Sequence, residues 1–390
     1  FTQIPLTPSL ATDYCLSDIQ AELSTLSGVG PSYKASPDGS YVVFRAIYDT
    51  PDTYELYSIP TGGGIPVRLN QNLSCDSELT SDFKMNALSN RVVYEIKTDG
   101  VTQLYSVSIT GGASVRLNGT LVSGGTVIDY DISLDGSTVV YRADQDTNNV
   151  MELYSIPITG GTPEKLNGSL SATEDVLDYR ISPDSGTVVY RADQDPGDVI
   201  ELYSVPISGG TPVRLNWTLV SGGDVEDFEI SGNSSRVVYR ADQDTDEMFE
   251  LYSVGITGGT PVRLNDSLVS GGDVFHYLVS PDNSRVIFRA DQDTDDLAEL
   301  YSVPLAGGTP VKISNSLASG GAVHHNFSIS PDSARVVFRS YQDSGEPYRL
   351  YSVPLDGSSA AVEINGTLVS GGFVVDHFQI SPDSARVVYV

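Results

Sequence analysis

Basic residues and cysteines are scarce in this chain, and long apolar runs are missing. The 390 residues include 22 lysines and arginines against 51 aspartates and glutamates, which gives a formal net charge of −29. This balance argues against nucleic-acid binding and against adhesion to anionic lipid, because both need a positive surface. No apolar run reaches the roughly 18–20 residues of a membrane-spanning helix, so we expect no insertion into a membrane.

The motifs of common enzyme classes are also missing. The sequence has no Gly-x-Ser-x-Gly elbow, no P-loop, no dinucleotide fingerprint and no Cys-x-x-Cys pair. All four histidines lie in the last third of the chain. His324 and His325 are adjacent, and adjacent strand residues point to opposite faces, so they do not suggest a metal site. We therefore expect a protein without enzymatic activity and without a required cofactor.

A repeat of about 49 residues runs through the whole sequence. Its aromatic position falls at Phe44, Tyr94, Tyr141, Tyr190, Tyr239, Phe288, Phe338 and Tyr389. Eight copies fill the chain, which predicts a single domain over residues 1–390. Residues 1–30 would form closing strands and a link, and residues 31–390 would hold the eight repeats, the last one incomplete.

Each repeat alternates apolar and polar residues over short runs that end at proline and glycine, which is typical of strands. In the fourth copy the four runs are Val176–Ile181, Thr187–Asp193, Glu201–Pro206 and Thr211–Leu215. Four antiparallel strands repeated eight times predict an all-β, eight-bladed β-propeller. The last copy stops after its second strand, so we expect N-terminal residues 2–6 to complete that blade and close the ring.

Two motifs resemble the repeats of the TolB-like β-propeller family. They are the turn Ser36-Pro37-Asp38-Gly39 and the strand Leu202-Tyr203-Ser204-Val205-Pro206, and related copies extend over nearly the whole chain. The second and fifth copies depart from the turn, with Asn86–Asn90 and with Gly232-Asn233. The resemblance implies the fold but no single function, because such propellers serve as interaction platforms, gating domains of peptidases and surface proteins.

The first strand of each repeat supplies a candidate binding ring. Its polar positions would face the central channel of a propeller, where carboxylates and imidazoles would hold a cation or a basic peptide terminus, or only keep a wet channel polar. The ring consists of Asp82, Asp129, Asp178, Asp227, His276, Asn326 and His377.

The hairpins between the second and third strands supply a candidate calcium site. Alternating aspartates resemble the hard oxygen ligands of calcium loops, although the glycine and glutamate of an EF-hand are missing; a solvated turn is the alternative. The residues are Asp242, Asp244, Asp246, Asp291, Asp293 and Asp295. Across the same hairpins we expect ion pairs between the arginines before the turn and the glutamates after it: Arg142, Arg191, Arg240 and Arg289 with Glu152, Glu201, Glu250 and Glu299.

Glycan acceptor triplets recur along the chain. Five of them share one register on the links between repeats, at Asn118, Asn167, Asn216, Asn265 and Asn365, so they indicate either a glycosylated face or a chance triplet copied by duplication. The triplets as a whole begin at Asn72, Asn118, Asn167, Asn216, Asn265, Asn326 and Asn365, with a further one at Asn233.

The two cysteines, Cys15 and Cys75, are expected either to form a disulfide that locks the ring closure or to remain free thiols. The chain begins at Phe1, which indicates a processed or partial product. We interpret the protein as a secreted, non-enzymatic scaffold or protein-interaction module, with protein partners or self-assembly into a surface layer or filament. It would be extracellular or at the cell surface, or periplasmic if bacterial and unglycosylated. The alternatives are a cation- or ligand-binding propeller and a gating propeller separated from a hydrolase.

Overall fold

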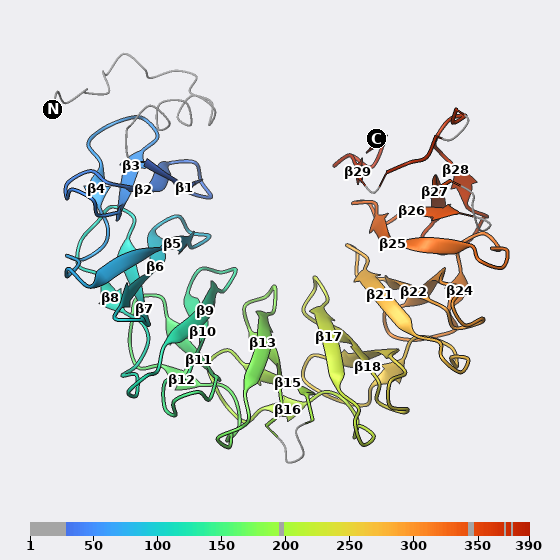
Figure 1. The fold of residues 1–390 in the computed structure, drawn as a ribbon, viewed down its shortest axis with the longest axis horizontal. Coiled ribbons are helices and arrows are strands. Elements are labelled where there is room, and N and C mark those ends of the chain that lie inside the picture. Colours follow the sequence, from blue (N-terminus) through green and yellow to red (C-terminus); the bar gives the residue numbers. More distant parts are fainter. Residues whose placement is uncertain (1–28, 195–198, 342–346, 370–371, 376) are drawn as a thin grey trace. The chain divides into compact units, whose positions relative to one another are not determined.

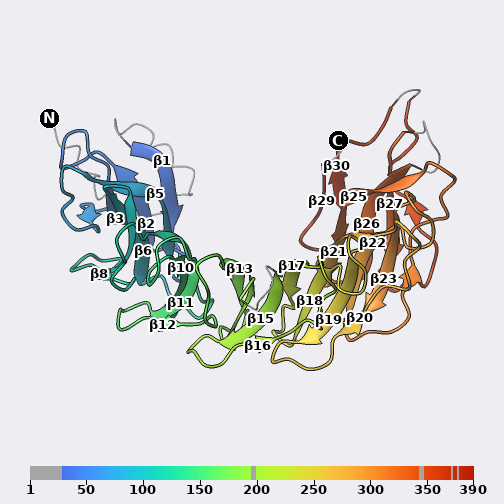
Figure 2. The same ribbon diagram turned by 60° about the horizontal axis from the view of Figure 1, so that its bottom comes forward.

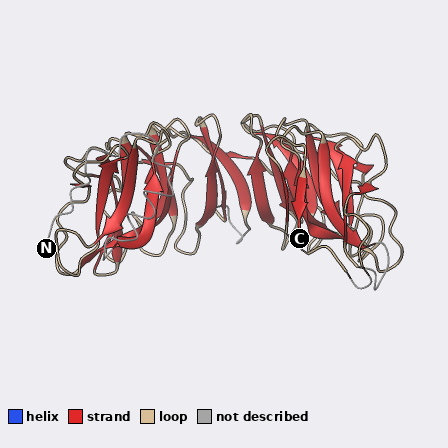
Figure 3. Cartoon of the chain, turned by 90° about the horizontal axis from the view of Figure 1, so that it is seen from above, coloured by secondary structure: helices blue, strands red, loops and turns tan. Residues whose placement is uncertain are grey.

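The computed structural model describes residues 29–194, 199–341, 347–369, 372–375 and 377–390. All regular elements in this part of the chain are β-strands, joined by loops and turns (Figure 3). They form seven four-stranded sheets and one two-stranded sheet, each with its strands in chain order (Figure 1). This confirms the predicted fold class, an all-β chain of eight antiparallel propeller blades.

We number the sheets as blades in chain order. Blades one to four consist of β1 (Val29–Ala35), β2 (Tyr41–Ala46), β3 (Glu55–Pro60) and β4 (Val67–Arg68); β5 (Ser77–Met85), β6 (Arg91–Thr98), β7 (Val101–Ser108) and β8 (Val115–Arg116); β9 (Val127–Ile132), β10 (Thr138–Ala143), β11 (Glu152–Pro157) and β12 (Glu164–Lys165); and β13 (Val176–Ile181), β14 (Thr187–Ala192), β15 (Glu201–Pro206) and β16 (Val213–Arg214).

Blades five to eight continue the pattern. They consist of β17 (Val225–Ile230), β18 (Arg236–Ala241), β19 (Glu250–Gly255) and β20 (Val262–Arg263); β21 (Val274–Val279), β22 (Arg285–Ala290), β23 (Glu299–Pro304) and β24 (Val311–Lys312); β25 (Ala322–Ile329), β26 (Arg335–Tyr341), β27 (Arg349–Pro354) and β28 (Val362–Glu363); and β29 (Phe378–Ile380) and β30 (Val387–Tyr389).

The chain divides into two compact units, Phe1–Val188 with Val205–Pro212 and Val189–Ser204 with Val213–Val390. The division passes through blade four, so blades one to three lie in the first unit and blades five to eight in the second. Each unit is described by itself. The single domain stays a prediction, and the closing segment of residues 2–6 lies outside the described residues.

The apolar core lies between consecutive blades. Between blades five and six, Val238 and Leu251 pack against Val286, Phe288 and Tyr301. The second strand of a blade is therefore buried on both faces, which explains its two consecutive valines. In each four-stranded blade, an aromatic pair stacks across the second and third strands, with ring centroids 5.2 to 5.9 Å apart. Such pairs add to the stability that apolar burial provides.

The Ser-Pro-Asp turns connect neighbouring blades. In blade six, Ser280 Oγ donates a hydrogen bond to Asp282 Oδ1 at 2.7 Å, and the Asp282 N–H donates to Ser333 Oγ of blade seven at 3.0 Å. Ser333 has a φ of 57°, which L side chains rarely adopt. The hydrogen bond that the Ser333 hydroxyl accepts joins two blades, and this contact offsets the cost of the strained backbone. The same bond links Asp38 to Ser89, Asp135 to Ser185 and Asp332 to Ser384.

The predicted ion pairs across the second hairpin are wrong, because the register places their members on opposite faces. In blade five, Arg240 lies opposite Leu251, and Glu250 lies opposite Ala241. A shift of one residue reverses the side-chain direction. Glu250 instead binds Arg263 of the fourth strand at 2.7 Å and accepts the Tyr252 hydroxyl at 2.7 Å. Glu55, Glu152, Glu201 and Glu299 have equivalent basic partners in Arg68, Lys165, Arg214 and Lys312.

Candidate binding face on the first strands

The hairpin aspartates serve the blade itself. Asp242 is buried, and its two carboxylate oxygens accept the N–H groups of Asp224 at 2.6 Å and Glu247 at 3.0 Å. Asp291 accepts the N–H groups of Asp273 and Asp296 in the same way, at 2.6 and 3.0 Å. These carboxylates hold the link and the hairpin together.

The other predicted calcium ligands are dispersed. Asp293 pairs with Lys312 at 2.8 Å, and Asp244 lies 3.9 Å from Arg263. Asp246 and Asp295 lie beside Gly222 and Gly271 of the links. Among the described residues, no group of three or more histidine, cysteine, aspartate or glutamate side chains is placed to hold a metal. Each aspartate of a hairpin thus has a different neighbour, and the predicted calcium site stays a prediction.

The repeated acceptor asparagines are buried caps of the third strand. Asn265 Oδ1 accepts the Leu251 N–H and its Nδ2 donates to Asp266 O, both at 2.8 Å, and the side chain is 4% exposed. A glycan on Nδ2 would break this arrangement in the folded protein. The same two bonds are made by Asn118, Asn167, Asn216 and Asn365. The structure assigns these five a structural role.

Three acceptor asparagines lie outside this register. Asn72 is exposed, Asn326 is half-buried in β25, and Asn233 accepts the Ser231 hydroxyl in its turn. Asn72 and Asn233 are thus the exposed acceptors of the predicted set. Cys75 is exposed, with its Sγ 3.3 Å from Asp76 Oδ2, whereas Cys15 lies outside the described residues, so the disulfide stays a prediction.

The first strands of the first unit carry alternating charges on their exposed face. Asp82 of blade two pairs with Lys34 of blade one at 3.2 Å. Asp129 of blade three accepts Arg142 Nε from its own second strand at 3.0 Å. Asp178 occupies the equivalent position in β13. The predicted ring residues of this unit therefore lie on the exposed faces of their first strands. Basic partners neutralise Asp82 and Asp129.

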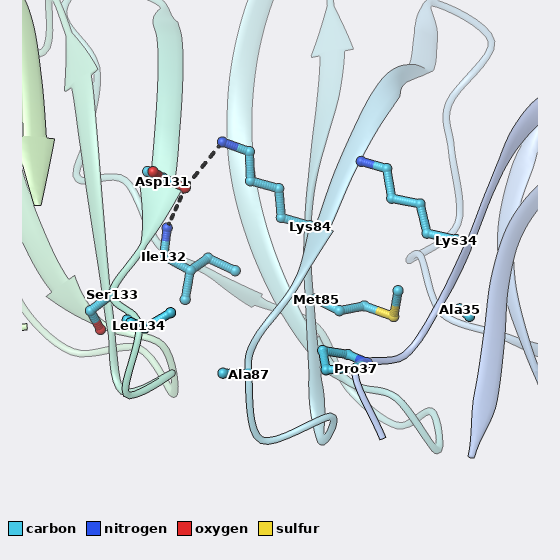
Figure 4. Close-up of a pocket in the computed structure, with 10 residues that line it drawn as sticks. All are labelled: Lys34, Ala35, Pro37, Lys84, Met85, Ala87, Asp131, Ile132, Ser133 and Leu134. Carbon is cyan, nitrogen blue, oxygen red and sulfur yellow. Dashed lines mark hydrogen bonds and ion pairs between the residues drawn. The ribbon is translucent and has the colours of Figure 1, made fainter. Parts of the chain in front are cut away.

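A pocket of about 530 Å³ opens on this face between blades one and three. Figure 4 shows Lys34 and Lys84 at one end, with Met85, Ile132 and Leu134 further along the wall. Lys84 Nζ lies 3.3 Å from Asp131 Oδ1, which also lines the pocket. The pocket therefore combines an apolar wall with charged groups of both signs, which suits recognition of a mixed polar and apolar surface.

Glu95 interrupts a series of arginines on the second strands. The corresponding residue in blade one, Arg45, donates to Leu79 O of the next blade at 3.1 Å. Glu95 instead accepts the Thr80 hydroxyl at 3.3 Å. Burial, together with the negative charges of Asp82 and Asp129, raises the pKa of Glu95 to about 7.

In the second unit, the predicted ring changes character from blade to blade. Asp227 of blade five accepts Arg240 Nε at 3.0 Å and Nη2 at 2.9 Å. In blade six the equivalent residue is His276, which lies opposite Arg289. Burial lowers the pKa of His276, and the positive charge of Arg289 acts in the same direction. The last predicted member, His377, is exposed beside β29.

A bulge in β25 overturns the expectation that His324 and His325 point apart. The pairing of β25 with β26 shifts between Val323 and Phe327, and the two imidazole centroids lie 4.0 Å apart. Burial lowers the pKa of His324 to about 4, and the positive charge of His325 adds to the shift. His324 is therefore uncharged at neutral pH. Sequence alternation could not locate this bulge, because a bulge breaks the period of two.

The comparisons with known proteins support the fold. No family model matches the chain, and no curated protein matches it. The solved structure of an eukaryotic initiation factor is 12% identical, with a TM-score of 0.55, over 94% of this chain and 82% of that one. Dipeptidyl peptidase 4 from Porphyromonas gingivalis is 10% identical, with a TM-score of 0.58, over 97% of this chain and 58% of that one. Both are propeller proteins, so the likeness shows the fold alone.

A TolB protein from Agrobacterium tumefaciens is 19% identical, with a TM-score of 0.34, over 64% of this chain and 83% of that one. The propeller fold that the predicted TolB-like resemblance implies is confirmed by the two likenesses with TM-scores above 0.5. Within the part of the chain that the structure describes, no helix is long and apolar enough to span a membrane.

Proposed function

We propose that this chain is a non-enzymatic β-propeller that binds other proteins, or further copies of itself, through the exposed face of its first strands. One observation carries this function. The repeated polar residues hold the blades together, whereas the residues that change from blade to blade lie on this face. At one register they are Lys34, Lys84, Asp131, Arg180, Glu229, Leu278, Ser328 and Gln379.

A constant frame with a variable exposed face is suited to recognition, because partner choice then depends on the face alone. The pocket beside Lys84 and Met85 adds an apolar anchor point within this face. In this proposal the protein acts outside the cell or at its surface, or in a bacterial periplasm if it is unglycosylated. The exposed acceptor Asn72 supports the first of these locations, because it is accessible to a glycan.

Lysine cross-linking in the cells that make the protein tests this proposal. Lys84 on a first strand and Lys165 and Lys312 on fourth strands have equal side-chain exposure, 36% each. The proposal predicts cross-links from Lys34 and Lys84 to other protein chains, with few from the two matched controls. Links that fall equally on all four lysines, or that all lie within one chain, would overturn it.

Self-assembly is the form of this function that the eighth blade favours. Its described part is the two-stranded sheet β29–β30, and Val388 and Val390 are 68% and 78% exposed. An exposed strand edge accepts a further strand from another chain. Light scattering over a wide concentration range distinguishes self-assembly from the binding of other proteins. A molecular mass that rises with concentration supports self-assembly, whereas a monomer at every concentration supports the binding of other proteins.

A second candidate function is the binding of a small ligand on the same face. The groups around Arg289 and His276 in blades six and seven favour it, because they differ from their counterparts in blade five.

A further inference from the structure

The second strands carry an arginine at one register, and this arginine joins neighbouring blades. In blade five, Arg240 Nη1 donates to Val274 O of blade six at 3.3 Å, and in blade six Arg289 Nε donates to Val323 O of blade seven at 2.7 Å. The arginine thus ties its blade to the next one. Its remaining N–H groups are free for a second partner.

That second partner differs between the two blades. Arg240 binds the carboxylate of Asp227, directly across from it on the first strand, at 2.9 Å. Across from Arg289 stands His276, and among the described residues Arg289 forms no ion pair. Its two terminal nitrogens make no hydrogen bond to a described residue, and they are not among the buried polar atoms of the described chain that lack one, so they reach solvent.

Arginine, histidine and aromatic side chains surround Arg289. Its guanidinium lies over the Phe275 ring at 4.8 Å, and Arg339 lies over Tyr348 at 4.4 Å. The Tyr348 ring meets the His324 and Tyr341 rings nearly at right angles, at 5.2 and 4.9 Å. β21 and β25, which carry the histidines, are neighbours (Figures 1 and 2).

Two carboxylates act on this cluster without pairing with it. Asp227 acts on His276 but is held by Arg240, and Asp291 acts on Arg289. Asp291 is buried, and both its oxygens accept backbone N–H groups of Asp273 and Asp296. Burial lowers the pKa of Arg289, and the charge of Asp291 only partly opposes that shift. A positive group that is partly desolvated and lacks a counter-ion favours an anion.

We propose that blades six and seven form a binding site for the oxyanion group of a ligand, with the Arg289 guanidinium as its main contact. A guanidinium offers paired N–H donors that match the oxygens of a carboxylate or phosphate. Phe275, Tyr341 and Tyr348 provide flat apolar surface for the rest of the ligand. In blade five the Asp227 carboxylate occupies the equivalent position and pairs with Arg240. In blade six His276 stands there instead and offers a ring nitrogen to the ligand.

Calorimetric titration of the full chain at neutral pH tests the site with benzoate and inorganic phosphate as probes. Benzamide is the uncharged match for benzoate. Three variants complete the design: Arg289→Gln removes the main contact, Arg142→Gln removes the equivalent residue of blade three, and His276→Asp gives Arg289 the carboxylate that Arg240 has. Circular dichroism and the melting temperature verify that each variant is folded.

We expect benzoate and phosphate to bind the wild type and the Arg142→Gln variant with affinities within about twofold of each other, and about tenfold more weakly to Arg289→Gln and His276→Asp. Benzamide is expected to bind much more weakly than benzoate. Equal binding by the wild type and a folded His276→Asp variant, or equal binding of benzamide and benzoate, would refute the site. The cross-linking result at Lys34 and Lys84 is independent of this outcome.

Discussion

Blades five and six share one frame and differ on one face. In both, a buried hairpin aspartate accepts the N–H of the preceding link at 2.6 Å, and a third-strand glutamate binds a basic residue of the fourth strand. On the first strand, however, Asp227 of blade five becomes His276 of blade six. A single exchange thus changes the charge of the face and leaves the frame intact. In the proposed function, stability and recognition would therefore be controlled by different residues of the same repeat.

The strongest test of this separation removes a frame residue. Asn265→Ala leaves the buried Leu251 N–H and the Asp266 carbonyl without their partner. We expect a loss of about 2–3 kcal/mol in the free energy of unfolding, because unsatisfied buried polar groups are costly. Urea unfolding followed by circular dichroism measures it.

Ser267→Ala is the matched control, since it destroys the same glycan acceptor triplet and keeps the asparagine. Ser267 is exposed, so we expect a change within about 0.5 kcal/mol. Equal losses in the two variants would show that Asn265 acts through a glycan and not as a buried cap.

A second test compares the two arginines directly. Arg240→Gln leaves the Asp227 carboxylate without its partner, whereas Arg289→Gln removes a guanidinium that has no ion pair. Since the Asp227 side chain is 43% exposed, we expect the first variant to lose only about 1 kcal/mol more than the second. Urea unfolding at low and high salt measures the difference, which should shrink with salt. If both variants lose the same free energy of unfolding at both salt concentrations, the exchange of Asp227 for His276 has no effect on stability.

The sequence period was sufficient to predict the blades. The first and third strands of blade four, Val176–Ile181 and Glu201–Pro206, agree with the structure at both ends, whereas the fourth shortens to Val213–Arg214. Alternation and turn residues are local signals, so they locate strands well. The fourth strand is short because only two residues of each link pair with the third strand.

The roles of the polar residues depend on strand register, so they were harder to predict from the sequence. The arginine–glutamate pairs were assigned across the wrong hairpin face, because a register shift of one residue is invisible in a single strand. Asn265 and Asp242 were interpreted as surface sites, although each is buried and accepts a backbone N–H that lies 14 or 18 residues away in the sequence. The exchange of Asp227 for His276 beside a retained arginine is visible in the repeats, and it is the sequence signal for the proposed site around Arg289.

Blade two offers the smallest but most specific contrast, because Glu95 stands where the other four-stranded blades have arginine. Its pKa is raised from 4.5 to about 7 by burial, so the folded state holds a proton more tightly than the unfolded state. Stability from this group is complete below pH 4.5 and is lost as the pH rises toward 7. Glu95→Gln removes that loss, so we expect its melting temperature to exceed that of the wild type by about one or two degrees at pH 8 and to match it at pH 4. Glu78→Gln, at an exposed position of the same blade, should change neither value. A difference between Glu95→Gln and the wild type that is the same at both pH values would mean that the carboxylate matters for packing and not for its charge, and the contrast between blade two and its neighbours would then be steric.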